Sequence, residues 1–278
     1  MEGGIVRVIP VCILLLLCGT ALGQLKTDIE YARVGETSLK LDVSTPTEGA
    51  GPFPVAIIIH GGGWSGGDKQ QDITPLFKPL NDAGFVWFSI NYRLAPANRW
   101  PACFDDVKTA IRWVKQHAGE YKGDPSRIVL FGHSAGGHLA FMAAQTGDTP
   151  VQAVVGLAPV TDFEQDLEQR GGLNKSLQDL LDRPQAVTEE SRTILRQIGP
   201  INHIKAGLPP FLVLQGSMDR TVQPVQSQNF VTRLKLAGVD AELVVVDGAG
   251  HRVTDWDKTD TTWTRKMIDW LKLKVQSK

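Results

Sequence analysis

A short motif at residues 132–136 contains a serine in a setting typical of nucleophiles. The segment reads Gly-His-Ser-Ala-Gly, which matches the pattern G-x-S-x-G, and it follows an apolar run at residues 128–131 that predicts a strand. In the strand–turn–helix unit called a nucleophile elbow, the glycines permit a sharp turn that lifts the serine hydroxyl clear of the sheet. Ser134 is therefore the candidate nucleophile, and its chemistry would be acyl transfer through a covalent intermediate.

A second motif lies upstream, in the order that the nucleophile elbow requires. Residues 55–59 are continuously apolar and are followed by His-Gly-Gly-Gly-Trp at residues 60–64. Loops of this type carry backbone N–H groups that stabilise the oxyanion formed when a serine attacks a carbonyl. We expect Gly62 and Gly63 to supply part of this oxyanion hole, and the N–H of Ala135 to supply the rest. The two motifs together predict a serine esterase.

Three further features near these motifs are expected to shape the site or support its loops. Trp64 is the first bulky side chain after the glycines, and it is expected to line the substrate pocket, with simple packing as the alternative. His60 is expected to brace the glycine loop through a hydrogen bond. The Asn-Tyr-Arg-Leu-Ala-Pro segment at residues 91–96 predicts a turn that holds neighbouring loops in place.

A serine hydroxyl needs a base to activate it, and in this arrangement the chain order is serine, acid, histidine. Three of the six histidines precede Ser134, and His138 follows it by one helical turn, pointing along the same predicted helix. His203 comes before the strand that we expect to carry the acid. His251 remains as the predicted base, in a Gly-Ala-Gly-His loop just beyond the carboxyl end of a predicted strand, where ligands bind in open α/β sheets.

Three aspartates are candidates for the acid that orients His251. Asp219 follows the strand predicted at residues 211–214 and is the preferred choice, because it would lie beside the His251 loop at the same sheet edge. Asp162, after the neighbouring strand, is the main alternative. Asp247 is a weaker one, since it is close to His251 in sequence.

The elements that must position these residues begin with a hairpin and continue as alternating strands and helices. Strands are predicted at residues 29–33, 39–43, 55–59, 85–90, 128–131, 153–157, 211–214 and 241–246, and helices at residues 105–117 and 263–272. This order favours an α/β fold with a mostly parallel eight-stranded sheet flanked by helices. One catalytic domain would occupy residues 24–278. The long polar interval at residues 162–206 predicts a small lid insertion above the site, with a surface excursion as the alternative.

Composition excludes several other classes of function. The chain has 278 residues, 42% of them hydrophobic, and a net charge of -1, so it can bury one large core but carries no basic stripe for nucleic acid. No metal-binding or phosphate-binding motif is present, so neither a metal nor another cofactor is implied. The expected partner is a small-molecule or polysaccharide ester, and the sequence predicts no oligomeric state.

The N-terminal residues 1–23 resemble a cleavable signal peptide. Arg7 precedes an apolar stretch at residues 8–17, and Ala21-Leu22-Gly23 offers small residues before a predicted cleavage after Gly23. The stretch is shorter than the roughly 20 apolar residues of a spanning helix, so stable membrane insertion is not expected, although an uncleaved anchor is the alternative. A secreted or periplasmic enzyme is predicted, with Cys103 its one remaining cysteine.

With these residues identified, the chain resembles the α/β-hydrolase superfamily, and within it the carboxylesterases that carry an H-G-G-G loop. It looks most like secreted bacterial carbohydrate esterases of the BD-FAE type, which are similar to acetylxylan and feruloyl esterases. The resemblance covers about residues 27–272 and rests on four segments, at residues 60–64, 67–69, 91–96 and 132–140. Gln215 departs from the family, since many relatives have histidine there.

The resemblance implies a Ser-Asp-His mechanism and the hydrolysis of carboxylic esters, with short-acyl or feruloyl esters of carbohydrates as the expected substrates. A general short-chain carboxylesterase or lipase, or an arylformamidase-like amidohydrolase, is the alternative. A more distant alternative is a non-catalytic binding module of the same fold. Because such silent relatives typically lose the serine or the histidine, the presence of Ser134 and His251 favours an enzyme.

Overall fold

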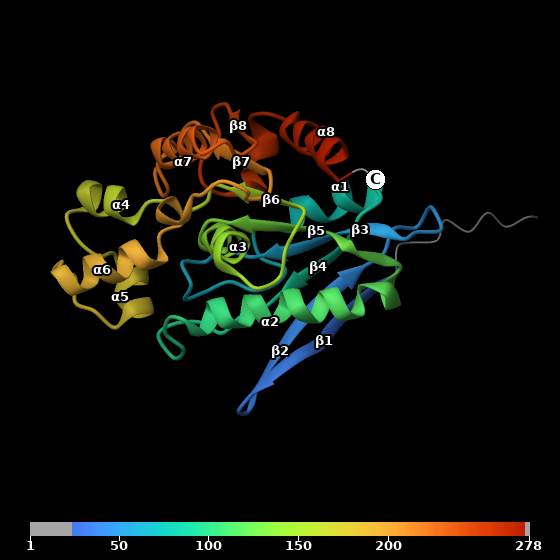
Figure 1. Ribbon diagram of the computed structural model, residues 1–278, viewed down its shortest axis with the longest axis horizontal. Coiled ribbons are helices and arrows are strands. Elements are labelled where there is room, and N and C mark those ends of the chain that lie inside the picture. The colour runs from blue at the N-terminus through green and yellow to red at the C-terminus, as the bar shows by residue number, and fades with distance from the viewer. Residues whose placement is uncertain (1–23, 276–278) are drawn as a thin grey trace, which may run out of the picture.

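The computed structural model describes residues 24–275, in which one mixed sheet forms the centre of the molecule (Figure 1). Its strands are β1 (Leu25–Val34), β2 (Thr37–Ser44), β3 (Phe53–Ile59), β4 (Val86–Ile90), β5 (Gly123–His133), β6 (Ala153–Leu157), β7 (Phe211–Gly216) and β8 (Ala241–Val246). They lie in the order β1-β2-β4-β3-β5-β6-β7-β8. Pairing is antiparallel from β1 to β4 and parallel from β4 to β8. The predicted eight-stranded, mostly parallel sheet is confirmed.

A turn joins β1 to β2 and a loop joins β2 to β3, and from β3 onwards each strand is connected to the next by helices. The α-helices are α1 (Phe77–Asp82), α2 (Ala102–His117), α3 (Ala135–Thr146), α4 (Phe163–Arg170), α5 (Lys175–Leu181), α6 (Glu189–Ile198), α7 (Pro224–Leu236) and α8 (Trp263–Lys274). Short 3-10 helices occupy Thr74–Leu76, Ala118–Tyr121, Pro200–His203 and Val253–Lys258. Between residues 24 and 275 none of these helices has the length and apolar character to cross a bilayer. The predicted signal peptide, residues 1–23, lies outside the described residues.

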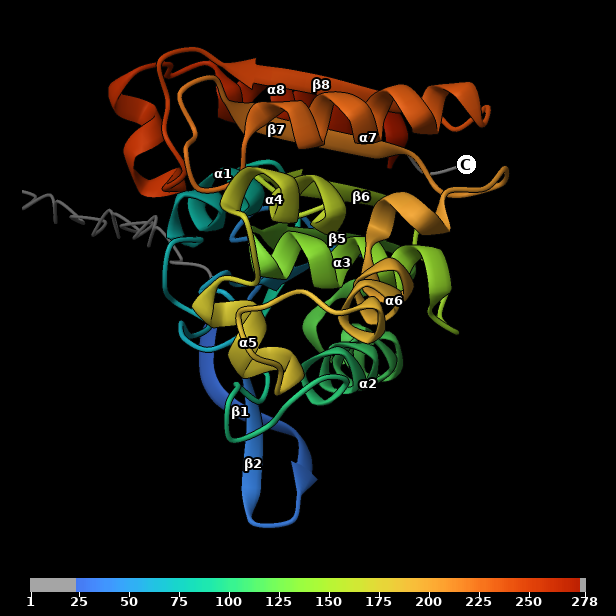
Figure 2. The same ribbon diagram turned by 90° about the vertical axis from the view of Figure 1, so that its left-hand side faces the viewer.

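The core consists of two layers, one on each face of the sheet. Along β3, Val55, Ile57 and Ile59 pack into one buried cluster with side chains of α2, α3 and α7, while Ala56 and Ile58 pack into the other with α1 and α8. Figure 2 shows α7, α3 and α2 one below the other in front of the sheet. Because successive side chains of a strand point to opposite faces, a strand covered on both sides must be apolar throughout, as β3 is.

The interval at residues 162–206, which we call the lid segment, folds into α4, α5 and α6. Figure 1 shows these helices grouped beyond one end of the sheet. Their starts are set by polar side chains, because Asp162, Asn174 and Thr188 each accept a hydrogen bond from a backbone N–H in the first turn of the helix that follows. The polarity of this interval therefore reflects helix capping as well as exposure to solvent.

Candidate active site

Ser134 lies in a sharp turn between β5 and α3. Its backbone has φ of +53° and ψ of -118°, outside the usual regions for a residue with a side chain. Such strain is typical of functional sites and is retained only where the surroundings impose it. The turn also requires a close approach, since a Cβ at Gly136 would lie 2.2 Å from the carbonyl oxygen of Ile59. The second glycine of the motif is therefore needed for packing against the neighbouring strand.

The structure brings the predicted nucleophile, base and acid into one hydrogen-bond chain. His251 Nε2 lies 3.0 Å from Ser134 Oγ, and His251 Nδ1 lies 2.8 Å from Asp219 Oδ2. The two alternative acids are elsewhere, since Asp162 caps α4 and Asp247 accepts a hydrogen bond from a serine hydroxyl. The arrangement matches that of a Ser-His-Asp triad, in which the carboxylate orients the imidazole for proton transfer.

The Asp219 carboxylate is buried and receives four hydrogen bonds. Thr221 N and Val222 N donate to Oδ1 at 2.8 and 3.0 Å, and Gln215 Nε2 donates to Oδ2 at 3.0 Å, beside the bond from His251. Burial opposes ionisation, but the hydrogen bond and charge of His251 and the backbone donors outweigh it and hold the pKa of Asp219 below its usual value. The acid is therefore ionised at neutral pH.

Gln215 occupies the position at which many relatives carry histidine. Its side-chain oxygen accepts a hydrogen bond from Ser227 Oγ at 2.7 Å, and both residues are almost completely buried. Because the hydroxyl donates to the oxygen, the amide nitrogen must face Asp219. This departure from the family pattern therefore leaves the acid with a donor that does not titrate.

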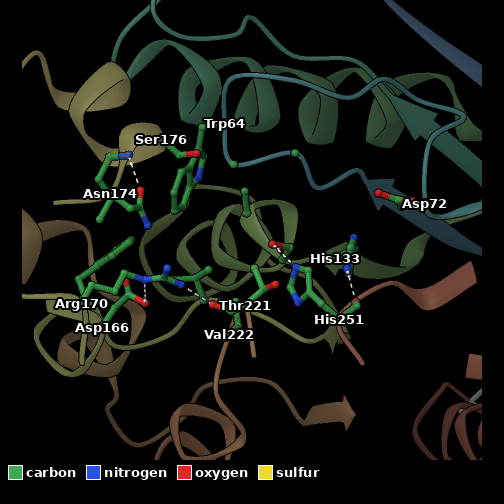
Figure 3. Close-up of a pocket in the computed structure, with 17 residues that line it drawn as sticks. Trp64, Asp72, His133, Asp166, Arg170, Asn174, Ser176, Thr221, Val222 and His251 are labelled. Carbon is green, nitrogen blue, oxygen red and sulfur yellow. Dashed lines mark hydrogen bonds and ion pairs between the residues drawn. The ribbon is translucent and has the colours of Figure 1, made fainter. Parts of the chain in front are cut away.

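His133 has a role that the sequence did not indicate, because its position before Ser134 only excluded it as the base. Its Nε2 lies 3.0 Å from the backbone oxygen of His251, and since a carbonyl only accepts, Nε2 carries the proton. Figure 3 shows the two rings side by side. Burial and the neighbouring His251 lower the pKa of His133 to about 4, so it stays neutral and fixes the loop that holds the base.

The glycine loop upstream lines the same cavity as Ser134 and His251, as does Ala135. Gly62 has φ of +99°, and a Cβ there would lie 2.1 Å from the backbone oxygen of Gly66, so only glycine can occupy the position. Gly63 also has a positive φ and lines the cavity. The residues predicted to form the oxyanion hole therefore surround the space next to the serine hydroxyl.

Two aromatic side chains, His60 and Tyr92, contact the backbone at the start of the glycine loop. The ring of His60 stacks on Tyr92 at 4.3 Å between centroids, and His60 Nδ1 lies 2.8 Å from the carbonyl oxygen of Gly61. The Tyr92 hydroxyl contacts that oxygen at 3.1 Å and the carbonyl oxygen of His60 at 3.0 Å. His60 and the turn at residues 91–96 thus hold the loop, in line with the sequence prediction.

Trp64 both lines the cavity and packs in the core. Its Nε1 donates to His138 Nδ1 at 3.1 Å, so the proton of His138 is on Nε2, which donates to the carbonyl oxygen of Ile198 at 2.8 Å. Ile198 ends α6, and His138 is completely buried. This chain of hydrogen bonds ties the glycine loop to the lid segment through the helix that follows the nucleophile.

The cavity above Ser134 has a volume of about 270 Å³ (Figure 3). Besides the glycine loop, Ser134, Ala135 and the two histidines, its lining includes Asp72, Val160, Phe163, Asp166, Arg170, Asn174, Ser176, Leu177, Thr221 and Val222. Six of these come from the lid segment, which therefore forms one wall of the site. Sequence reasoning missed these lid residues individually, and the only signal for them was the length and polarity of the interval.

Within residues 24–275, no group of three or more His, Cys, Asp or Glu side chains is placed to hold a metal ion. Cys103 is buried, and burial raises the pKa of its thiol to about 12, so it is not a competing nucleophile.

Three buried histidines make the free energy of unfolding depend on pH. Burial lowers the pKa of His60, His133 and His138 to about 4, below the value of about 6.5 expected in the unfolded chain. The unfolded state then binds more protons between these values, so stability falls as pH drops from about 6.5 towards 4. We expect a loss of roughly 1–2 kcal/mol per histidine between pH 7 and pH 5.

Urea unfolding at the two pH values measures this loss, and His138→Gln should reduce the difference between them. An unfolding free energy that is the same at pH 5 and pH 7 would contradict the assignment of neutral, buried histidines.

Comparisons with known proteins agree with the geometry. A sequence model of the BD-FAE family matches residues 41–234. The probable carboxylic ester hydrolase LipM of Mycobacterium tuberculosis is 37% identical over 226 residues, which is 75% of this chain and 51% of LipM. Esterase LipC of the same organism is 33% identical over 216 residues, 72% of this chain and 53% of LipC. The chain thus spans about half the length of the curated relatives it matches.

Solved structures cover the chain more completely. A truncated carbohydrate esterase from gut microbiota has a TM-score of 0.80 and 27% identity, over 93% of this chain and 99% of that one. Esterase Est2 of Thermogutta terrifontis has a TM-score of 0.73 and 27% identity, over 92% and 93% of the two chains. The fold is that of the α/β-hydrolases, and the resemblance found in the sequence is confirmed: this chain belongs to the BD-FAE family.

Proposed function

We propose that the chain is a serine hydrolase that cleaves carboxylic esters. The observation that carries the proposal is the unbroken hydrogen-bond chain from Ser134 through His251 to Asp219, opening into a cavity beside a glycine-rich loop. The esterase names of the relatives and of the structural neighbours support it.

The geometry supports a two-step mechanism. Ser134 Oγ attacks the ester carbonyl carbon while His251 Nε2 takes its proton, and backbone N–H groups of Gly62, Gly63 and Ala135 stabilise the oxyanion. The intermediate collapses as His251 returns the proton to the departing alcohol, which leaves an acyl group on Ser134. Water, deprotonated by His251, then hydrolyses this ester and releases the acid. Asp219 stabilises the imidazolium in both steps.

Labelling with a serine-directed organophosphate tests the proposal. The compound should abolish hydrolysis of p-nitrophenyl acetate at one equivalent per chain, and peptide mass spectrometry should locate the phosphoryl group on Ser134. Full activity after treatment, or a label on another residue, would contradict the mechanism.

Short-acyl or feruloyl esters of carbohydrates are the substrates we propose. The similarity to a carbohydrate esterase over nearly the whole chain supports this class, as does the presence of four polar lid residues in the cavity wall. We also propose that residues 1–23 are a cleaved signal peptide and that the enzyme is secreted or periplasmic. Mass spectrometry of the exported protein would then find an N-terminus at Gln24.

The size of the cavity predicts a preference for short acyl groups. The cavity of about 270 Å³, with Trp64 beside the glycine loop, must hold the alcohol as well as the acyl group, so we expect it to accommodate an acyl group no longer than acetyl or butyryl. A further methylene that stays in water gains none of the roughly 0.8 kcal/mol, about fourfold in affinity, that burial would supply, and one forced into the filled cavity strains its walls. We expect kcat/KM for p-nitrophenyl esters to fall steeply from butyrate to octanoate and palmitate. A maximum at octanoate or beyond would instead favour a lipase whose lid is residues 162–206.

A further inference from the structure

One wall of the cavity carries four polar side chains from the lid segment. They are Asp166 and Arg170 from α4, Asn174 before α5 and Ser176 within it, and together we call them the lid strip. Figure 3 shows all four on the opposite side of the cavity from His133. None of them takes part in the hydrogen-bond chain of the nucleophile, so the catalytic step alone does not account for them.

The charges of the lid strip are already balanced. Arg170 Nε donates to Asp166 Oδ1 at 2.8 Å, and Arg170 Nη2 donates to the backbone oxygen of Thr221 at 2.6 Å. Arg170 Nη1 and Asp166 Oδ2 make no hydrogen bond among the described residues. The pair therefore offers the free N–H groups of Arg170 and the free carboxylate oxygen of Asp166 with little net charge, an arrangement that suits a neutral polar group better than an anion.

The other two residues of the strip also keep polar atoms available. Asn174 Oδ1 accepts from Leu177 N at 2.9 Å and so caps α5, which leaves both protons of Nδ2 without a partner among residues 24–275. The Ser176 hydroxyl is likewise unpartnered in that part of the chain. The cap holds the Asn174 amide in place before any ligand binds, which lowers the entropic cost of using it.

We propose that the lid strip binds free hydroxyl groups of the alcohol half of the substrate and thereby selects polyol esters over esters of apolar alcohols. Hydroxyls both donate and accept, which matches the mixture of free donors and acceptors on the strip. An apolar alcohol in the same place would leave these groups unpaired, and sites built for hydrogen bonds reject analogues that lack them. This inference rests on the proposed esterase function.

The test compares two acetates of secondary ring alcohols that differ in their hydroxyl groups. A monoacetylated methyl xyloside has free hydroxyls, and cyclohexyl acetate has none, while the acyl group stays constant. Because a sugar hydroxyl is the better leaving group, each kcat/KM is divided by the rate of hydroxide-catalysed hydrolysis of the same ester. The wild-type enzyme should hydrolyse the xyloside with a kcat/KM at least tenfold higher after this division. Equal values for the two acetates would overturn the proposal.

Two variants test the lid strip without altering Ser134, His251 or Asp219. Asn174→Asp keeps a good helix cap but replaces the free donor by an acceptor, and Ser176→Ala removes a hydroxyl that has no other partner in the described chain. Each should lower kcat/KM for the xyloside about three- to tenfold, and the double variant about thirtyfold, by the usual cost of lost hydrogen bonds. Activity on cyclohexyl acetate should stay within twofold.

Asn229→Asp is the matched control, because it makes the same chemical change on an exposed side chain of α7 that has no hydrogen bond within the described chain and lies outside the cavity lining. This variant should keep kcat/KM for both acetates within twofold of the wild-type values. Equal losses on both acetates in the strip variants, or no loss on either, would contradict the inference. These outcomes are distinct from failure of the proposed function, in which the wild-type enzyme would hydrolyse neither acetate nor p-nitrophenyl acetate.

Discussion

Replacing Ser134 by alanine should abolish ester hydrolysis while leaving the fold intact. The substitution removes one oxygen whose only side-chain hydrogen bond in the described structure is with His251, so the packing around the turn should be little changed. Loss of the nucleophile in serine hydrolases lowers kcat about 10⁶-fold, although oxyanion donors and substrate binding retain about 10³-fold catalysis over water. Hydrolysis of p-nitrophenyl acetate under saturating conditions measures the effect.

Two further measurements make the Ser134→Ala result decisive. Thermal unfolding and the circular dichroism spectrum should match those of the wild-type protein, because no buried apolar group is lost. The variant should also fail to react with the organophosphate. Activity close to that of the wild type would show that another group attacks the carbonyl and would overturn the assignment of the nucleophile.

Asp219→Asn is expected to lower kcat about 10⁴-fold with a smaller effect on KM, as the equivalent change does in a well-studied serine protease. The carboxylate accepts hydrogen bonds on both oxygens, from Thr221 and Val222 on one and from His251 and Gln215 on the other. An amide can accept on one side only, so its NH₂ group must face donors. The variant either favours the wrong tautomer of His251 or breaks the turn that carries the acid.

Asp162→Asn provides the control for Asp219→Asn, since asparagine also caps helices well and the side chain only accepts a hydrogen bond from Gln165 N. We expect its kcat to stay within about twofold of the wild type. The acid would be wrongly assigned if Asp162→Asn were inactive while Asp219→Asn remained active, and steady-state kinetics of the two purified variants distinguish these results.

The strands that position the site were predictable because their signals are local. β6 and β8 have the predicted bounds, and β3 is apolar throughout, as a strand covered on both faces must be. α7 was not predicted, because the face of this helix that packs against the sheet carries polar as well as apolar residues. Gln226 and Ser227 are buried there as polar residues, so the apolar periodicity that identifies a helix is interrupted. Gln226 instead bonds to the backbone of Thr161, a contact that only folding creates.

By itself, the sequence identified the proposed nucleophile, the glycine loop and the proposed base, because each is encoded in a few adjacent residues or in chain order. Only the tertiary structure decided among the three possible acids, since the contact of Asp219 with His251 spans 32 positions and depends on the parallel pairing of β7 with β8. It also decided the roles of His133 and Gln215 and the polar wall of the cavity. Those roles depend on which donors and acceptors meet across distant segments, and no local pattern of residue types records that pairing.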